Sequence, residues 1–494
     1  MKRTFKILSA MLALVMLFSM TVMFASCGKD VDDGTVSDAA VTVYAEEGLP
    51  ELEVKDLGGM EIKFLWPEMH SDGHYLHNEI SVTENTGDVI DNAVATRNTI
   101  VQAAYNVKIT SELEFISTIP KTIRTQAQAG ESTYSAIAST IKFMTPIAQE
   151  GLLTDFNSLE YYDESHPWWN HDLMQGFSIA NARYFGTGDI IYSDDFYPYC
   201  TYVNTKVSQS YGITDNYYEL VKNKEWTLEK FHTLAARAVD GSIDGDPNTW
   251  SADDMNGAVI NSNFVRAAYY SAGKGMLDFD AAGYPIWQMT VERTQGILEK
   301  VIDIIHKDSA CFNSDVFDQH AIEEIKIFTA NKTLFLVEEL IISERITKSD
   351  NKADFMLLPY PLYNEDAEYT CVLNDSLIIG IPVMAANKDD IGLVLSAMSR
   401  ESIATLTPAF FETVLKYRYM QDPDSVETLQ TILDSTVAPD VATVQDWGGF
   451  MAQFKALATS NNKNFSSYFA QNIGVAMGEL EKYNVLLDTY YDAE

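Results

Sequence analysis

Strand-like and helix-like segments alternate along the chain, and this alternation limits the possible folds more than any other feature. Residues alternate between apolar and polar over Met60 to Trp66, and Val107 to Phe115 and Tyr134 to Thr140 are the next strand candidates. Asp88 to Tyr105 carries an apolar stripe at helical spacing, and Ile119 to Ala129 is a second helix candidate. Strands separated by helices predict an α/β unit with a largely parallel sheet.

A second unit of the same kind begins with the strand candidate Tyr199 to Asn204. Thr227 is a suitable N-cap for a following helix, because its hydroxyl can accept a hydrogen bond from the first turn. Phe355 to Leu358 and Leu377 to Ile381 are short apolar strand candidates, and the final third of the chain has mainly helical patterns. The sequence therefore predicts two α/β units followed by a helical part.

The first 27 residues have the composition of an export signal. An apolar run from Ile7 to Phe24 follows a basic start and ends in Ala25-Ser26-Cys27. This arrangement resembles a bacterial lipoprotein signal, which implies a lipid on Cys27 and a chain held at the outer face of the cell membrane. Because Phe24 stands where Leu is usual, a plain secretory signal stays an alternative, and the length of the run also allows a transmembrane anchor. We interpret residues 28–56, rich in acidic and small residues, as a flexible tether.

The net charge of −37 disfavours nucleic acid as a partner, because an acidic surface repels phosphate backbones. An apolar content of 46% predicts a globular protein, and 494 residues suggest two to three compact units.

The sequence lacks the usual signatures of metal and catalytic sites. Histidines and cysteines show no metal-ligand spacing, and no nucleotide-binding or hydrolase motif occurs, so we expect no metal and no cofactor. The loop with Asp244, Asp246 and Asn248 begins like a calcium-binding loop, but Thr249 and Met255 break the pattern, and a surface loop is the preferred interpretation. Whether any two of the cysteines pair stays open for Cys200, Cys311 and Cys371.

Several short motifs occur in an order that is typical of one protein family. They are Tyr202-Val203-Asn204-Thr205-Lys206, Glu225-Trp226-Thr227-Leu228-Glu229-Lys230-Phe231, Ala330-Asn331-Lys332-Thr333-Leu334-Phe335, Leu358-Pro359-Tyr360-Pro361, and Ile381-Pro382 with Ala386-Asn387-Lys388. With them the chain resembles, from about Met60 to Tyr490, extracellular solute-binding protein family 1, the substrate-binding lipoproteins of ABC transporters.

The resemblance implies a two-lobed α/β fold of the periplasmic-binding-protein type II, with a hinge and a helical C-terminal part. The N-terminal lobe would comprise residues 57–197 and 375–420, and the C-terminal lobe residues 198–374 and 421–494. The resemblance also implies a monomer that is not an enzyme, whose partners are a small solute and the ABC permease subunits.

Aromatic side chains in loops are the main candidates for ligand contacts, since flat rings pack against the apolar faces of sugars. In an extended strand, adjacent side chains point to opposite sides, so we expect Trp168 or Trp169 to face a cleft or solvent. The other candidates lie at strand ends, at the expected crossing between lobes, or in the second lobe: Trp66, Ser139, Thr140, Asp195, Tyr197, Trp287 and Trp447.

These residues predict a neutral sugar or oligosaccharide, because few Arg or Lys lie near the same loops. A peptide or a cationic solute is the alternative, since a ring face also attracts a cation. A secreted carbohydrate-active enzyme is a further alternative, but among 71 acidic residues pairs of carboxylates occur by chance.

The signal assignment predicts that metabolic labelling with a radioactive fatty acid marks the wild-type chain and leaves Cys27→Ser unlabelled, because only the thiol of Cys27 is acylated. Label retained by Cys27→Ser would contradict the lipoprotein assignment, and Cys311→Ser serves as the control that keeps its label.

Overall fold

The computed structural model describes residues 48–68, 78–82, 87–178, 182–239, 254–273, 275–280, 284–349, 353–374, 376–410 and 423–491. Residues 1–49 and 50–494 are separate units, and both sheets belong to the second unit. Cys27, most of the expected tether, and the loop with Asp244, Asp246 and Asn248 lie outside the described residues.

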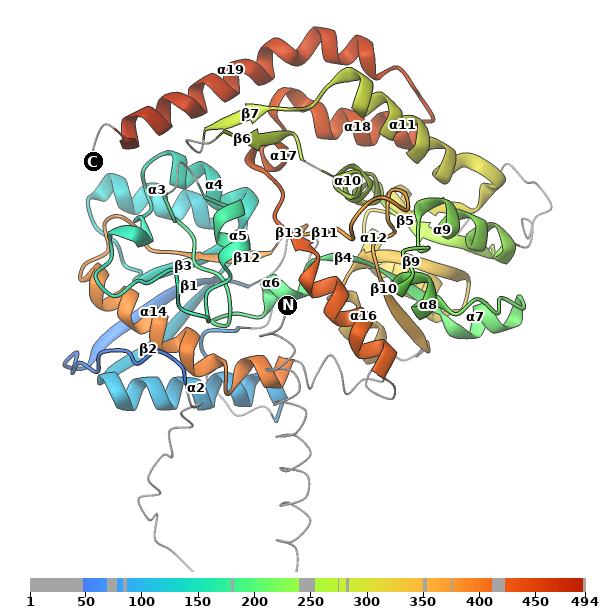
Figure 1. Cartoon of the computed structure of the whole chain (residues 1–494). Coiled ribbons are helices and arrows are strands. Elements are labelled where there is room, and N and C mark those ends of the chain that lie inside the picture. The colour runs from blue at the N-terminus through green and yellow to red at the C-terminus, as the bar shows by residue number, and fades with distance from the viewer. Residues whose placement is uncertain are drawn as a thin grey trace, which may run out of the picture. The chain divides into compact units, whose positions relative to one another are not determined.

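The first sheet has the strand order β12-β3-β1-β2. β1 (Met60–Pro67) pairs in parallel with β2 (Val107–Glu114) and β3 (Ala136–Thr140), and β12 (Leu377–Gly380) joins β3 antiparallel. The sheet is flanked by α2 (Val89–Tyr105), α3 (Ile119–Ala129), α4 (Ile141–Gln149) and α14 (Lys388–Ser402) (Figure 1). The largely parallel sheet expected for this unit is therefore confirmed, with one antiparallel edge strand added from far along the chain.

The second sheet has the strand order β10-β4-β9-β5-β8. β5 pairs in parallel with β8 and β9, whereas β4 runs antiparallel to both of its neighbours. The strands are β4 (Tyr199–Asn204), β5 (Asn256–Ile260), β8 (Cys311–Asn313), β9 (Thr333–Glu339) and β10 (Phe355–Pro359). The helices of this unit are α7 (Thr205–Ser210), α8 (Tyr217–Lys222), α9 (Leu228–Ala235), α10 (Ser262–Ser271), α11 (Val291–His306), α12 (His320–Thr329) and α13 (Ile342–Lys348).

Two segments connect the sheets and lie side by side. The first leads through α6 (Ser193–Phe196) into β4, and the second leads from β11 (Cys371–Val372) back to β12. Pro198 and Leu373 form an antiparallel bridge, and the amide of Asn374 donates to the carbonyl of Tyr197 at 3.2 Å. The first sheet thus takes its edge strand from beyond the second sheet in sequence, and elements after β12 return to the second lobe, where β13 (Thr436–Val437) pairs with β11. The predicted fold class, two α/β lobes that are discontinuous in sequence, is confirmed.

The remaining elements pack mainly around the second sheet (Figure 1). They include the antiparallel hairpin of β6 (Leu277–Phe279) and β7 (Pro285–Trp287), and β13 (Thr436–Val437), which pairs with β11. The C-terminal helices are α16 (Pro423–Asp434), α17 (Val441–Val444), α18 (Phe450–Thr459) and α19 (Phe465–Tyr491). α18 packs against α10 and α11, so the helical end of the chain supports the elements that border the cavity described below.

The last residues of the expected tether contact the first lobe. Lys55 forms an ion pair of 2.6 Å with Asp390 of α14, and Arg400 of the same helix donates to the carbonyl of Pro50 at 3.2 Å. The exact boundaries of tether and lobes stay predictions.

Arg97 of α2 is a fully buried cation that joins three segments of the first lobe. Its guanidinium donates to the carbonyls of Glu79 at 2.7 Å, Ile80 at 3.2 Å and Ile190 at 2.9 Å. A further bond reaches Ser402 of α14 at 3.3 Å. A buried guanidinium is tolerated only where its donors are satisfied, so these carbonyls fix the loop positions around the helix.

We therefore expect Arg97→Met to lower the free energy of unfolding by about 3 kcal/mol, because the buried carbonyls lose their donors. Urea denaturation measures the change. Arg124→Met is the control, since the Arg124–Glu150 pair is exposed and its loss costs about 1 kcal/mol or less. Equal effects of the two substitutions would contradict this account.

Candidate functional site

A cavity of about 370 Å³ is lined by residues that follow strands of both sheets. Ile141 and Lys142 come directly after β3, and Glu338 and Glu339 end β9. Ligands of open α/β sheets bind at the carboxyl ends of strands, so the cavity lies where this class of fold places a ligand. The remaining lining residues are Tyr199, Asn263, Arg266, His320, Ala321, Ile342, Arg345, Asn374, Thr443, Val444, Asp446 and Lys455.

Arg266 of α10 is held in the cavity by an amide. Its Nη2 donates to Oδ1 of Asn374, and Nδ2 of Asn374 donates to Oε1 of Glu339. The Nε of Arg266 is shielded from solvent and has no hydrogen-bond partner. The guanidinium is therefore oriented from one side and keeps an unused donor.

The acidic wall of the cavity continues into a buried pair of glutamates. Nδ2 of Asn261 donates to Oε1 of Glu338 at 2.6 Å and to Oε1 of Glu324, from α12, at 3.3 Å. Both carboxyl groups are buried, which raises the pKa of Glu324 to about 7 and that of Glu338 well above its usual range. Two carboxylates in contact with one amide cannot both ionise easily, so the pair holds a proton at neutral pH.

Asp446 also lines the cavity, but its Oδ1 already accepts hydrogen bonds from backbone amides. It accepts the amide protons of Met451 at 2.8 Å and Ala452 at 3.2 Å, in the first turn of α18. A carboxylate at a helix N-terminus stabilises the helix, so Asp446 has a structural role in addition to its place at the cavity.

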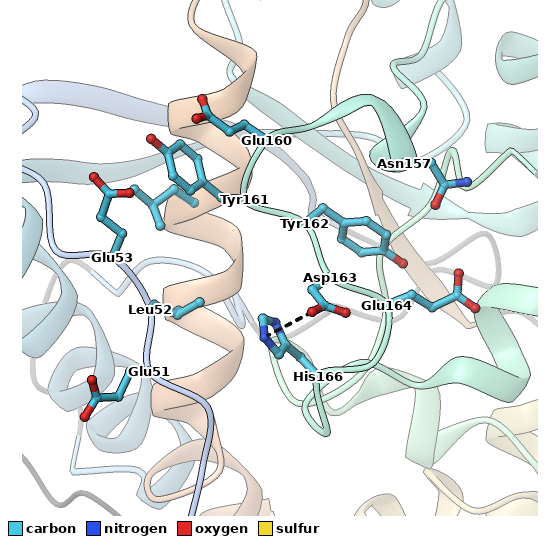
Figure 2. A pocket seen from close by; sticks show the side chains of 11 residues that line it. Glu51, Leu52, Glu53, Asn157, Glu160, Tyr161, Tyr162, Asp163, Glu164 and His166 are labelled. Carbon is cyan, nitrogen blue, oxygen red and sulfur yellow. Dashed lines mark ion pairs between the residues drawn. The ribbon is translucent and has the colours of Figure 1, made fainter. Parts of the chain in front are cut away.

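A second cavity, of about 440 Å³, lies inside the first lobe between residues 51–53, residues 157–166 and α14 (Figure 2). Five carboxylates line it, from Glu51, Glu53, Glu160, Asp163 and Glu164. His166 lies 3.8 Å from Asp163, and burial lowers the pKa of this imidazole. No group of three side chains suited to hold a metal ion occurs among the described residues.

The two adjacent tryptophans are both buried, so the expectation that one faces a cleft or solvent is wrong. Trp168 stacks on His166 with 4.2 Å between ring centroids, and Trp169 contacts Phe156 and Tyr162. Their backbone forms a turn, with only an isolated bridge from Trp169 to Gly188, so the alternation of an extended strand does not apply. The indole nitrogens of both have no hydrogen-bond partner.

The other predicted contact residues lie at four places. Trp66 and Ser139 are buried within the first sheet, and Trp287 contacts Phe450 and donates to the carbonyl of Met289. Asp195 lies in α6, where burial raises the pKa of its carboxyl to about 6. The remaining three adjoin residues of the first cavity without lining it: Thr140 precedes Ile141, the carbonyl of Tyr197 accepts the amide proton of Asn374, and Trp447 follows Asp446.

None of the nine predicted residues lines either cavity, and their role in ligand binding stays a prediction. Lys142, Arg266 and Glu338 were not predicted as site residues, although Lys142 follows the strand candidate Tyr134 to Thr140. The position of Lys142 just after a strand was a usable signal, since Thr140 was chosen because it lies at the end of the same strand. Arg266 gave no such signal, because it lies on a helix.

We expect Glu324→Gln to change how stability depends on pH. A carboxyl whose pKa is raised in the folded state contributes stability below about pH 4.5, which is lost as the pH rises toward 7. The variant lacks this loss. From pH 5 to pH 7.5 the free energy of unfolding of the wild type should therefore fall by on the order of 1–3 kcal/mol relative to that of the variant. Urea denaturation at both pH values checks this. Glu323→Gln, which removes only the ion pair with Lys326, is the control, and its stability should depend on pH as that of the wild type does. The same pH dependence for Glu324→Gln as for the wild type would refute the shared proton.

Within the described residues no helix is both long and apolar enough to cross a membrane. No protein-family model and no curated protein sequence matches the chain.

Solved structures, however, share its fold. The cyclic alpha-maltosyl-1,6-maltose binding protein from Arthrobacter globiformis superposes with a TM-score of 0.56 at 13% identity, over 87% of this chain and 100% of the other. An ABC substrate-binding protein from Listeria monocytogenes in complex with cycloalternan gives 0.53 at 12%, over 87% and 99%. UgpB from Mycobacterium tuberculosis in complex with glycerophosphocholine gives 0.53 at 13%, over 88% and 100%. The chain therefore has the two-lobed fold of ABC-transporter substrate-binding proteins.

Proposed function

We propose that the protein is the substrate-binding receptor of an ABC importer and that it holds a saccharide between its lobes without changing it. The observation that carries this proposal is the cavity at the carboxyl ends of β3 and β9, which residues of both lobes line. A site built from two lobes can enclose a solute when the lobes close around the connecting segments. Such closure serves to bind the solute and does not require a catalytic group.

The ligands of the structural neighbours support the saccharide class. Two of the three are named for, or bound to, cyclic glucose oligomers, and the third holds glycerophosphocholine. All three ligands are polyhydroxylated or phosphorylated polar solutes, and the carboxylates and amides of the cavity suit hydroxyl donors.

The lipid anchor, the tether and the permease partner are proposed from the sequence alone. Cys27 would carry the lipid, residues 28–56 would join it to the folded lobes, and the receptor would act as a monomer that delivers to permease subunits. The nine residues chosen from sequence remain proposed ligand contacts, and Thr140, Tyr197 and Trp447 are the strongest candidates among them because each adjoins a residue that lines the cavity.

A thermal-shift screen of the full chain in mild detergent tests the function. A saccharide present at about 100 times its dissociation constant should add roughly 2.7 kcal/mol to the free energy of unfolding, because it binds only the folded state. The protein-bound saccharide, recovered and analysed by mass spectrometry, should be unchanged.

Two results would contradict the proposal. Stabilisation by peptides or quaternary amines alone would establish the alternative receptor, and recovery of a cleaved saccharide would establish an enzyme. Asn263→Leu, which alters the cavity wall, should reduce the shift, whereas Asn216→Ser, at the N-cap of α8 and away from the cavity, should keep it.

A further inference from the structure

The cavity between the lobes differs in charge from the rest of the molecule. The chain has 71 acidic and 34 basic residues. In the cavity lining the balance is reversed, with the basic residues Lys142, Arg266, Arg345 and Lys455 against the acidic residues Glu338, Glu339 and Asp446.

The acidic groups of the lining are engaged within the protein. Asp446 caps α18, and Glu339 accepts from Asn374. Glu338 accepts from Asn261 at one oxygen and from the amide of Glu339 at the other, and it shares the buried environment of Glu324. Each of these carboxylates therefore already accepts hydrogen bonds from the protein, which makes it less available to a cationic solute.

Two basic groups, in contrast, lack a carboxylate. Among the described residues none lies within ion-pair distance of Lys142 or Arg266. Arg266 keeps a shielded Nε without a partner, and the Asn374–Glu339 contact orients its guanidinium. Lys142 is exposed in the first turn of α4, where the helix dipole also favours an anion.

We propose that the solute carries an anionic group, which Arg266 of one lobe and Lys142 of the other bind together. The shared chemistry is a carboxylate, phosphate or sulfate on a polyhydroxylated solute, such as a uronic acid, a sugar phosphate or a sulfated sugar. A guanidinium presents a planar set of donors that fits these oxyanions, and a lysine supplies a mobile point charge. This inference rests on the proposed function and proposes an anionic sugar where the sequence predicted a neutral one.

The reason for the difference lies in which elements build the cavity. The neutral sugar was expected because the predicted contact loops carry few basic residues. The cavity is lined instead by the starts of α4 and α12 and by α10, α13 and α18, and its basic side chains come from these helices.

Isothermal titration calorimetry of the full chain in mild detergent tests the inference with four probes. Trigalacturonate, glucose 1-phosphate and a sulfated disaccharide carry the three anions, and maltotriose is the neutral comparison. We expect at least one anionic probe to bind more tightly than maltotriose, with an affinity that falls severalfold between 50 and 500 mM NaCl. The probe that binds identifies the anion.

Lys142→Gln and Arg266→Gln should each weaken that probe about tenfold or more, a larger loss than either substitution causes for maltotriose, because only the anionic probe loses a charge partner. Lys121→Gln, on the exposed face of α3, makes the same change in net charge away from the cavity and should have no effect. Because Lys142 is exposed, its substitution tests the inference even if Arg266→Gln lowers stability.

The outcomes separate this inference from the function on which it rests. Binding of maltotriose more tightly than every anionic probe, with no loss of affinity at 500 mM NaCl, would overturn the anionic solute while supporting the saccharide receptor. Failure of all four probes and of the wider saccharide screen would overturn both.

Discussion

The structure depends on two neighbouring segments that connect the sheets. Pro198 and Leu373 pair antiparallel. At Pro198 the chain passes from the first lobe into β4 of the second, and after Leu373 it returns to the first lobe at β12. Because β12 completes the first sheet beside β3, the edge of this lobe is built from residues that follow the second lobe in the sequence. The cavity then lies next to these segments, since Tyr199 and Asn374 both line it.

Much of the fold was predictable because its elements are encoded locally. Asp88 caps α2 with its side chain, Gly130 ends α3 in the left-handed conformation, and Thr290 caps α11. Thr227 caps α9 as expected. These signals depend on residues one turn apart, which a single sequence contains in full. The alternation of strands and helices then fixes the fold class, although it does not give the strand order.

The candidate site was much less predictable, because it depends on contacts between distant residues. Trp168 and Trp169 were expected at a cleft from their chemistry, yet a turn directs both into the core. Glu324 and Glu338 meet only through Asn261, and no local pattern shows that these three residues come together. Arg266 could be located only once α10 was placed beside the returning segment. Sequence indicates which groups are available, and the tertiary fold decides which of them share a surface.

The position of Asn374 links the cavity to the geometry of the whole receptor. This residue belongs to the returning segment, yet its amide also orients Arg266. A change in the angle between the lobes would therefore move the group that aligns the guanidinium. Affinity and interlobe angle then become thermodynamically coupled, and a solute that binds more tightly at one angle shifts the population toward that angle by the ratio of its two affinities. In such a receptor a substitution at the connecting segment can alter solute selectivity without touching the solute.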